Sequence, residues 1–147
     1  MSNVFEHAVR LLARREHACQ ELGEKLKQKG YATHEIEAAL TECQRLGLQS
    51  DQRYAETLCR VRIRQGYGPI RIRRELQQWQ IASDLLETVL GQERDQWHIY
   101  ARAVIDKKYH QNEDTSYEAR QKQKKFLLYR GFSTETIQQV FHKEFSV

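Results

Sequence analysis

The sequence has little of the material from which tight turns and disulfides are made. Its 147 residues include one proline, seven glycines and three cysteines. So little turn chemistry argues against β-hairpins, whereas the many Glu, Gln, Lys, Arg, Leu and Ala residues favour helices. Cys19, Cys43 and Cys59 form no CxxC pair, and three thiols cannot all pair within one chain. We therefore predict an all-α protein with reduced cysteines.

Long apolar runs are also missing. No stretch approaches the roughly 18 to 20 apolar residues that a membrane span requires. The N-terminal segment MSNVFEHAVRLLARREH lacks the cleavage signal of a secreted protein. The length excludes a large multidomain enzyme and allows one domain or a few small units. We expect a monomeric, cytoplasmic protein without membrane contacts.

Motifs for metal, nucleotide and catalytic sites are absent as well. The histidines are scattered, and His34-Glu35 is not followed by a second histidine four residues later. There is no GxxxxGK[ST] loop, and GYGPIR lacks the third glycine of a dinucleotide-binding fingerprint. The carboxylates lie mostly on polar helix faces. We predict no metal, no cofactor and no enzymatic activity.

An internal repeat with a period of about 50 residues organises the chain. The aligned stretches are residues 26–40, 76–90 and 127–141. Their shared apolar positions are Leu26, Leu76 and Leu127; Tyr31, Ile81 and Phe132; Ile36, Leu86 and Ile137; and Leu40, Leu90 and Phe141. Such a unit is too small to bury its apolar face alone and needs its neighbours. The pattern therefore predicts three tandem three-helix repeats that form an elongated, curved array. The expected repeats are residues 1–48, 49–92 and 93–147.

Turn and cap residues predict where helices begin and end. Gly66-Tyr67-Gly68-Pro69 should end one helix, over 51–65, and start the next, because glycine permits positive φ and proline suits a first helical position. The first helices of the other repeats are expected over 4–14 and 93–109. Candidate N-caps of the third helices are Thr33, Ser83 and Thr134. The polar stretch 110–116 predicts a mobile loop or, alternatively, an N-cap at Ser116.

Arginine is concentrated on both sides of the Gly66–Pro69 turn. No acid interrupts the sequence from Arg60 to Arg74, although the net charge of the whole chain is only +4. Helical spacing places Arg53, Arg60 and Arg64 on one face, away from the apolar stripe of Tyr54, Leu58 and Val61. A second basic cluster follows at residues 120–130. Such groups bind phosphates or a partner's carboxylates, or they form a solvated helix face.

Aromatic residues near these clusters have two interpretations. Tyr67 lies at the tip of the turn, where it stacks on a base, fills a partner's groove or packs against Tyr54. Trp79 and Trp97 fall on apolar stripes and are expected in the core. The complete set of candidate binding residues is Arg53, Arg60, Arg64, Tyr67, Arg71, Arg73, Arg74, Lys122, Lys124, Lys125 and Arg130.

Residues 47–76 resemble the central signature of the RecX family, bacterial regulatory proteins that modulate the RecA recombinase. The matching residues are Asp51, Arg53, Tyr54, Ala55, Gly66, Tyr67, Gly68, Pro69, Ile72, Glu75 and Leu76. Residues 13–31 and 126–137 resemble the first and last repeats of the family. Gln80 stands where members commonly have a glycine that ends the second helix of the middle repeat.

The resemblance implies a non-enzymatic protein of three tandem three-helix units that lies in the groove of a RecA–DNA filament. It further implies inhibition of recombinase and ATPase activity, a role in DNA repair, recombination and the SOS response, and non-sequence-specific binding to single- and double-stranded DNA. The residues alone leave a second interpretation open. A helix-turn-helix transcription regulator also has three-helix units with an arginine-rich helix for the major groove. A nuclease would need clustered acidic metal ligands, which the sequence lacks.

Overall fold

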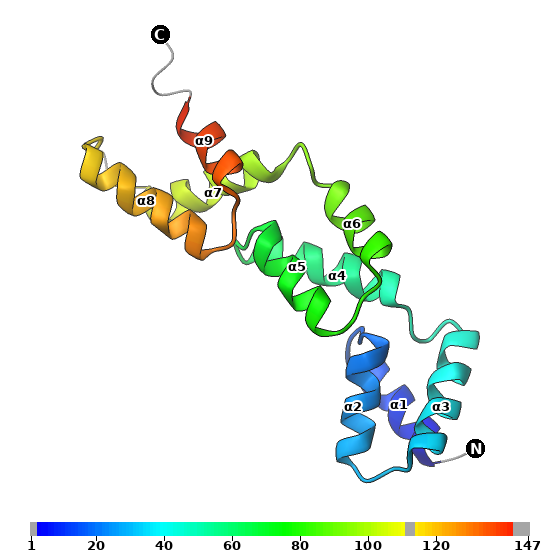
Figure 1. Ribbon diagram of the computed structural model, residues 1–147. Coiled ribbons are helices and arrows are strands. Elements are labelled where there is room, and N and C mark those ends of the chain that lie inside the picture. Colours follow the sequence, from blue (N-terminus) through cyan, green and yellow to red (C-terminus); the bar gives the residue numbers. More distant parts are fainter. Residues whose placement is uncertain (1–2, 111–113, 143–147) are drawn as a thin grey trace. The chain divides into compact units, whose positions relative to one another are not determined.

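The computed structural model describes residues 3–110 and 114–142, and within these ranges the chain forms helices and no strand (Figure 1). The helices are α1 (Asn3–Arg14), α2 (Cys19–Gln28), α3 (Thr33–Arg45), α4 (Asp51–Arg64), α5 (Pro69–Gln78), α6 (Ser83–Gly91), α7 (Trp97–Lys108), α8 (Tyr117–Tyr129) and α9 (Thr134–His142). The predicted all-α class and the tandem three-helix pattern are confirmed.

The aligned apolar positions of the repeat are core positions. Leu26, Leu76 and Leu127 are completely buried at equivalent places in the second helix of each repeat. The other aligned positions are also buried, except that Tyr31 and Leu40 are half-buried. The period read from the sequence therefore reflects burial and not chance.

The chain divides into two compact units. The first contains the residues up to Leu58 together with Leu76–Leu86. The second contains Cys59–Glu75 and the residues from Glu87 onward. Each of the helices α4, α5 and α6 consequently contributes residues to both units.

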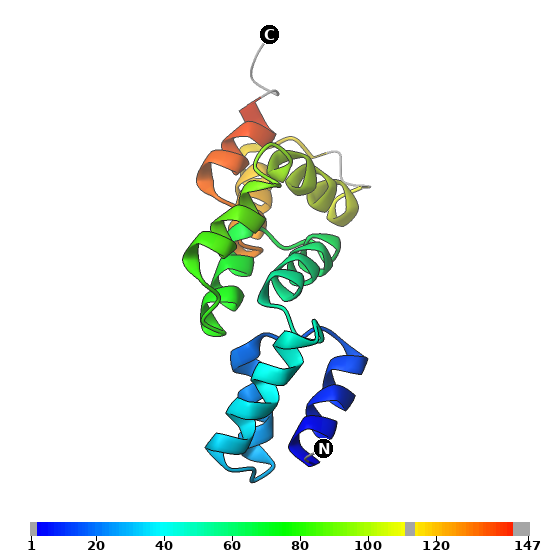
Figure 2. The same ribbon diagram turned by 90° about the vertical axis from the view of Figure 1, so that its right-hand side faces the viewer.

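In the first unit, α1, α2 and α3 contact one another and lie side by side (Figure 2). Their shared core consists of Val4, Ala8, Leu22, Leu26, Ile36, Ala39 and Cys43. In the first turn of α2, Glu21 accepts a hydrogen bond from the backbone N–H of Ala18 and pairs with Arg15. This pairing satisfies a donor at the start of α2 and holds a largely buried carboxylate in its charged form.

A histidine is fully buried near the start of α2. The Nδ1–H of His17 donates to the carbonyl of Arg15 at 3.0 Å, which leaves Nε2 to accept from Nζ of Lys25 at 2.9 Å. Burial lowers the pKa of His17 from its ordinary 6.5. Because Nε2 accepts a hydrogen bond only in the neutral imidazole, protonation of His17 would break the contact with Lys25, whereas Nδ1–H donates in either state.

In the second unit, α7, α8 and α9 contact one another. Trp97, Ala101 and Ile105 are buried on α7, as are Leu127 on α8 and Phe141 on α9. The prediction that Trp97 belongs to the core is confirmed.

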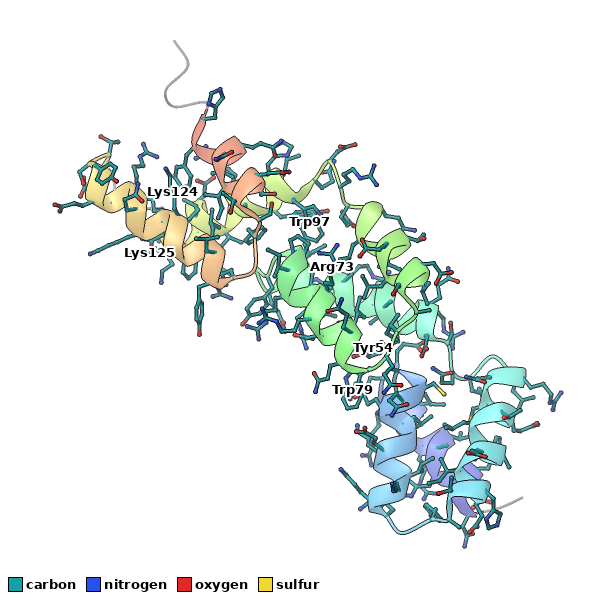
Figure 3. All side chains as sticks on the ribbon, viewed as in Figure 1. Tyr54, Arg73, Trp79, Trp97, Lys124 and Lys125 are labelled. Atoms are coloured by element: carbon teal, nitrogen blue, oxygen red, sulfur yellow. The ribbon has the colours of Figure 1, made fainter. Side chains whose placement is uncertain are left out.

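The same prediction for Trp79 is wrong, because this residue follows the end of α5 and is only half-buried (Figure 3). An apolar position one residue beyond a helix no longer follows the spacing of the buried stripe.

Helix starts differ from the prediction by one residue. Ala32 is the N-cap of α3, with the extended angles φ −73° and ψ 149°, and Thr33 is already helical. Before α9, Ser133 Oγ accepts from the N–H of Thr136 at 3.1 Å, so that serine occupies the capping position and Thr134 is the first helical residue. Ser83 is likewise the first residue of α6. The chain enters each helix one residue earlier than the candidate caps suggested.

Two other boundaries concern the third repeat. The helix expected over 93–109 begins only at Trp97, with Gln96 as its N-cap. Ser116 Oγ accepts from the N–H of Ala119 at 3.2 Å and caps α8, which confirms the alternative given for this serine. Residues 111–113 of the predicted mobile loop lie outside the described residues.

The second helix of each repeat is followed, two residues after its last helical residue, by a residue in the left-handed region. Gly30 and Gly131 have φ of 92° and 95°, whereas Gln80 occupies the equivalent place with φ 58°. The N–H of Gln80 bonds to Gln77 and that of Ile81 to Leu76, the pattern of a Schellman motif. The middle repeat therefore keeps the glycine-type turn with a residue that has a side chain.

Candidate functional site

The Gly66–Pro69 turn meets the turn between α8 and α9 in the second unit. As predicted, α4 ends before this turn, Gly66 has a positive φ of 89°, and α5 begins at Pro69. The N–H of Gly68 donates to the carbonyl of Arg130 at 2.8 Å, and the N–H of Ile70 donates to Gly131 at 2.9 Å. Ile70 is in the first turn of α5, where an N–H has no partner within the helix. Backbone groups therefore join the two turns.

Two glycines make this approach possible. A Cβ added to Gly68 would lie 2.5 Å from the carbonyl oxygen of Gly131. A Cβ added to Gly131 would lie 2.8 Å from both the Cβ and the backbone N of Arg71. Such distances are far inside van der Waals contact with rigid backbone, so only glycine fits at either position.

Tyr67 is held by two arginines at this junction. The guanidinium carbon of Arg71 lies 3.9 Å from the centroid of the Tyr67 ring, and that of Arg130 lies 4.8 Å from the same centroid. Each cation–π contact contributes about 0.5 to 1 kcal/mol at a partly exposed site. The half-buried Tyr67 is thus part of an intramolecular stack with Arg71 and Arg130.

Carboxylates hold several arginines of the dense run. Nε of Arg62 donates to both carboxylate oxygens of Glu75 at 3.0 Å. Arg73 makes two hydrogen bonds of 3.1 Å to Glu87. Arg74, in contrast, is exposed and forms no ion pair with any residue that the structure describes.

Two other arginines of α4 and α5 also have partners within the chain. Arg53 binds Glu16 at 3.0 Å and the carbonyl of Gly47 at 2.8 Å. Nε of Arg71 lies 3.7 Å from Glu75, in addition to its stack on the tyrosine. The arginine-rich signature is therefore in large part an intramolecular network, and its positive charge is partly neutralised.

A cavity of about 400 Å³ opens beside the Gly66–Pro69 turn in the second unit. Residues of α4, α7 and α8 line it. Its apolar and aromatic lining is Ile63, Ala103, Val104, Tyr100 and Phe126. Its cationic lining is Arg64, Lys107, Lys108 and Arg130, and the lining contains no acidic residue.

Aromatic rings and a backbone carbonyl position two of the four cations. Nζ of Lys108 lies 4.6 Å from the centroid of the Phe126 ring, and the guanidinium of Arg130 lies 5.0 Å from it. Nη1 of Arg130 also donates to the carbonyl of Gln65 at 3.4 Å. None of the four cations forms an ion pair within residues 3–110 and 114–142. The charge at the cavity is therefore not neutralised, and two of its carriers, Lys108 and Arg130, are held in place.

Only part of this cavity was expected from the sequence. Arg64 and Arg130 were candidates, whereas Tyr100, Lys107 and Lys108 on α7 were missed. The spacing of these three residues, with Val104 between them, places all four on one helix face. Because this face combines a tyrosine and a valine with two lysines, the density of arginine along the sequence does not reveal it.

The outer surface of α8 carries the second predicted cluster. Lys122 and Lys125 are exposed, while Lys124 is half-buried with Nζ 5.7 Å from the ring of Phe141 (Figure 3). Two tyrosines absent from the candidate set, Tyr117 and Tyr129, are 77% and 81% exposed on the same helix. Exposed aromatics among lysines are typical of surfaces that contact single-stranded nucleic acid.

Other functional chemistry is scarce in the described part of the chain. It contains no group of three or more His, Cys, Asp or Glu residues that could hold a metal ion. Burial raises the pKa of the Cys59 thiol to about 11, so this sulfur is a protonated core atom. None of the helices in the described residues is long and apolar enough to span a membrane.

Comparison with protein families assigns all three repeats. Residues 5–43 match the first three-helix domain of RecX, residues 50–90 match the second, and residues 100–141 match the third. Together these matches cover most of the chain.

Individual proteins show the same relationship. The chain is 52% identical over 141 residues to the "Regulatory protein RecX" of Legionella pneumophila strain Corby. The aligned residues make up 96% of this chain and 94% of that protein. The chain is 36% identical to the protein of that name from Vibrio vulnificus, with 98% and 94% covered. The crystal structure of RecX from Lactobacillus salivarius has the same fold, with a TM-score of 0.82 at 22% identity over 95% of this chain and 93% of that one. The chain therefore belongs to the RecX family of regulatory proteins.

Proposed function

We propose that this chain is a non-enzymatic regulator that binds the RecA–DNA filament and inhibits its recombinase and ATPase activities. It acts in the cytoplasm as a monomer and so modulates DNA repair, recombination and the SOS response. The observation that carries this proposal is the match of all three repeats, in order, to the three RecX domains. The absence of a metal-ligand cluster from the described residues is compatible with a role in binding.

Two surfaces serve this function. The junction of Tyr67, Arg71, Arg73 and Arg74 anchors the chain in the filament groove, because arginine and tyrosine dominate many protein interfaces. The remaining candidate cations contact DNA phosphates without reading bases, so binding to single- and double-stranded DNA does not depend on sequence. They are Arg53, Arg60, Arg64, Lys122, Lys124, Lys125 and Arg130.

Inhibition of RecA tests the proposal directly. ATP hydrolysis by RecA on single-stranded DNA is measured with the chain present at well below one molecule per RecA protomer. We expect inhibition, because weak contacts to several neighbouring protomers add through effective concentration. Unchanged hydrolysis up to equimolar amounts would contradict the proposal.

A block of substitutions locates the anchor. Alanine at Arg71, Arg73 and Arg74 together should weaken inhibition about tenfold or more. Alanine at Lys27 and Lys29, exposed cations at the end of α2, provides the matched control. Circular dichroism and thermal melting must show both variants folded, since Arg71 and Arg73 also have partners within the chain. Equal inhibition by the two variants would place the anchor elsewhere.

The same preparation tests the alternative of a transcription regulator. A helix-turn-helix regulator prefers its own duplex site over random DNA by several kcal/mol. We expect equal affinity for unrelated duplexes at a fixed salt concentration. A strong preference for one duplex, together with unchanged RecA activity, would favour the regulator of transcription.

A further inference from the structure

We propose that the cavity beside the Gly66–Pro69 turn binds one nucleotide of a single-stranded nucleic acid, with its unstacked base inside and its phosphate at the cationic rim. This inference rests on the proposed function, because it deepens the non-specific contact with DNA into a defined site. It adds residues of α7 that the family signature and the arginine clusters did not indicate.

The charge of the cavity favours an anion. Arg64, Lys107, Lys108 and Arg130 line it, its lining contains no acidic residue, and no described carboxylate pairs with these four cations. The one carboxylate hydrogen-bonded to a described lining residue is Glu93, which accepts from the hydroxyl of Tyr100 at 2.6 Å. The four cations differ from Arg73 nearby, whose charge is neutralised by a carboxylate. An anion that enters the cavity thus meets cations without first displacing an ion-pair partner.

The size and apolar character of the cavity suit one nucleotide. About 400 Å³ lies near the lower end of the range for small-molecule sites, so the cavity fits one nucleotide and excludes a duplex. Ile63, Ala103 and Val104 provide apolar contacts. A nucleobase has apolar faces that gain from such burial, whereas a simple phosphate or carboxylate does not.

Aromatic rings hold two of the cations at the cavity. Lys108 and Arg130 both lie over the Phe126 ring, and Arg130 also lies over the Tyr67 ring, so their charges are positioned for a phosphate at the rim. Tyr129 precedes Arg130 in the chain and is 81% exposed, so the next base along a strand has an aromatic side chain available. Alternation of planar groups and cations suits a strand in which bases and phosphates alternate, and an acidic peptide lacks that alternation.

Binding of oligonucleotides with and without bases tests the site. Fluorescence anisotropy measures the affinity of the whole chain for labelled oligothymidylate and for an abasic oligonucleotide of equal length and charge. We expect oligothymidylate to bind about tenfold more tightly, because stacking of a base is absent from the abasic strand. Equal affinities of the unmodified chain for both strands would overturn the proposal.

A substitution that fills the cavity separates base binding from charge. Ala103 is exposed on α7 and lines the cavity, so Ala103→Phe occupies the space without removing a cation. We expect this variant to bind oligothymidylate about as weakly as the abasic strand, whose affinity stays unchanged. The control is Ala38→Phe at an exposed position of α3, which should leave both affinities as they are. Retention of the tenfold preference by Ala103→Phe would refute the site.

Photocrosslinking of the unmodified chain covers the case in which Ala103→Phe does not fold. An oligonucleotide with 5-iodouracil should crosslink to Tyr100 or Phe126, mapped by mass spectrometry, and crosslinks only elsewhere would overturn the proposal. If Ala103→Phe weakens RecA inhibition but not oligonucleotide binding, the cavity takes a protein group and the proposal is likewise wrong. Failure of the proposed function is a separate result, namely no RecA inhibition by the unmodified chain.

Discussion

Replacing Gln80 with glycine should stabilise the chain. Gln80 lies two residues after the last residue of α5, Gln78, and has φ 58°, in the left-handed region that favours glycine. A side chain there costs about 1 to 2 kcal/mol. Glycine avoids that cost but loses about 0.5 to 1 kcal/mol because its unfolded backbone is freer. We therefore expect a net gain of about 0.5 to 1 kcal/mol in the free energy of unfolding, or about 1 to 4 °C in Tm.

The reverse substitution at the equivalent turns provides matched controls. Nothing lies within 4 Å of a Cβ added to Gly30, so Gly30→Gln tests the backbone cost alone and should lose about 1 kcal/mol. Gly131→Gln adds a clash, because its Cβ would lie 2.8 Å from Arg71. That variant should lose about 2 to 4 kcal/mol. Urea unfolding followed by circular dichroism measures all three changes.

Two results would refute this reasoning. If Gln80→Gly is neutral or destabilising while Gly30→Gln costs the expected amount, the Gln80 side chain makes a stabilising contact that exceeds the backbone cost. If Gly30→Gln and Gly131→Gln lose equal free energy, the close approach at Gly131 contributes nothing to stability.

Three further substitutions test the turn junction, the buried histidine and the cavity. Gly68→Ala should lower the free energy of unfolding by about 2 to 4 kcal/mol, because its methyl group would meet the backbone of Gly131. In the control Gly91→Ala, the methyl group would meet only the flexible tip of Arg94 at 3.7 Å, and the free energy of unfolding should change by less than about 0.5 kcal/mol. Thermal melting compares the two variants. The chain should lose stability as the pH falls below 6.5 towards the lowered pKa of His17, because the histidine of the unfolded chain takes up its proton at a higher pH than that of the folded chain. The difference in Tm between pH 7 and about pH 5 should therefore be smaller in His17→Gln than in the unmodified chain. Lys107→Gln should reduce the slope of log affinity for single strands against log salt concentration by about 0.7. Arg73→Gln should change that slope little, because Arg73 is already paired with Glu87. Equal effects of the two substitutions would contradict the distinction between unpaired and paired cations.

The sequence predicted those features that depend on local spacing. Leu26, Leu76 and Leu127 are buried at the places that the repeat assigned to them, and the turn at Gly66 and Pro69 separates two helices as expected. Apolar periodicity and turn chemistry act over a few residues, so the sequence displays them directly.

Features that join distant segments could not be predicted in the same way. The partner of Arg62 lies thirteen positions away on α5, and the partner of Arg73 lies fourteen positions away on α6. Which carboxylate meets which arginine depends on how the helices pack. The cavity is harder still, since α4, α7 and α8 each supply part of its lining. A list of basic residues by sequence density does not distinguish paired from unpaired cations.

That distinction changes where the positive potential of the second unit is expected. The densest arginine run is partly neutralised: Arg62 and Arg73 each bind a glutamate, and Arg71 lies near one as well. Around the cavity, Lys107 and Arg130 have no described acidic partner. A paired guanidinium must exchange one carboxylate for another when a partner binds, so its net gain is small and it contributes mainly geometry and specificity. An unpaired cation gains the full attraction of an incoming phosphate. The arginine-rich signature is therefore best suited to shape the junction, and the cationic face built by α7 and α8 is best suited to attract the anionic strand that we propose as its ligand.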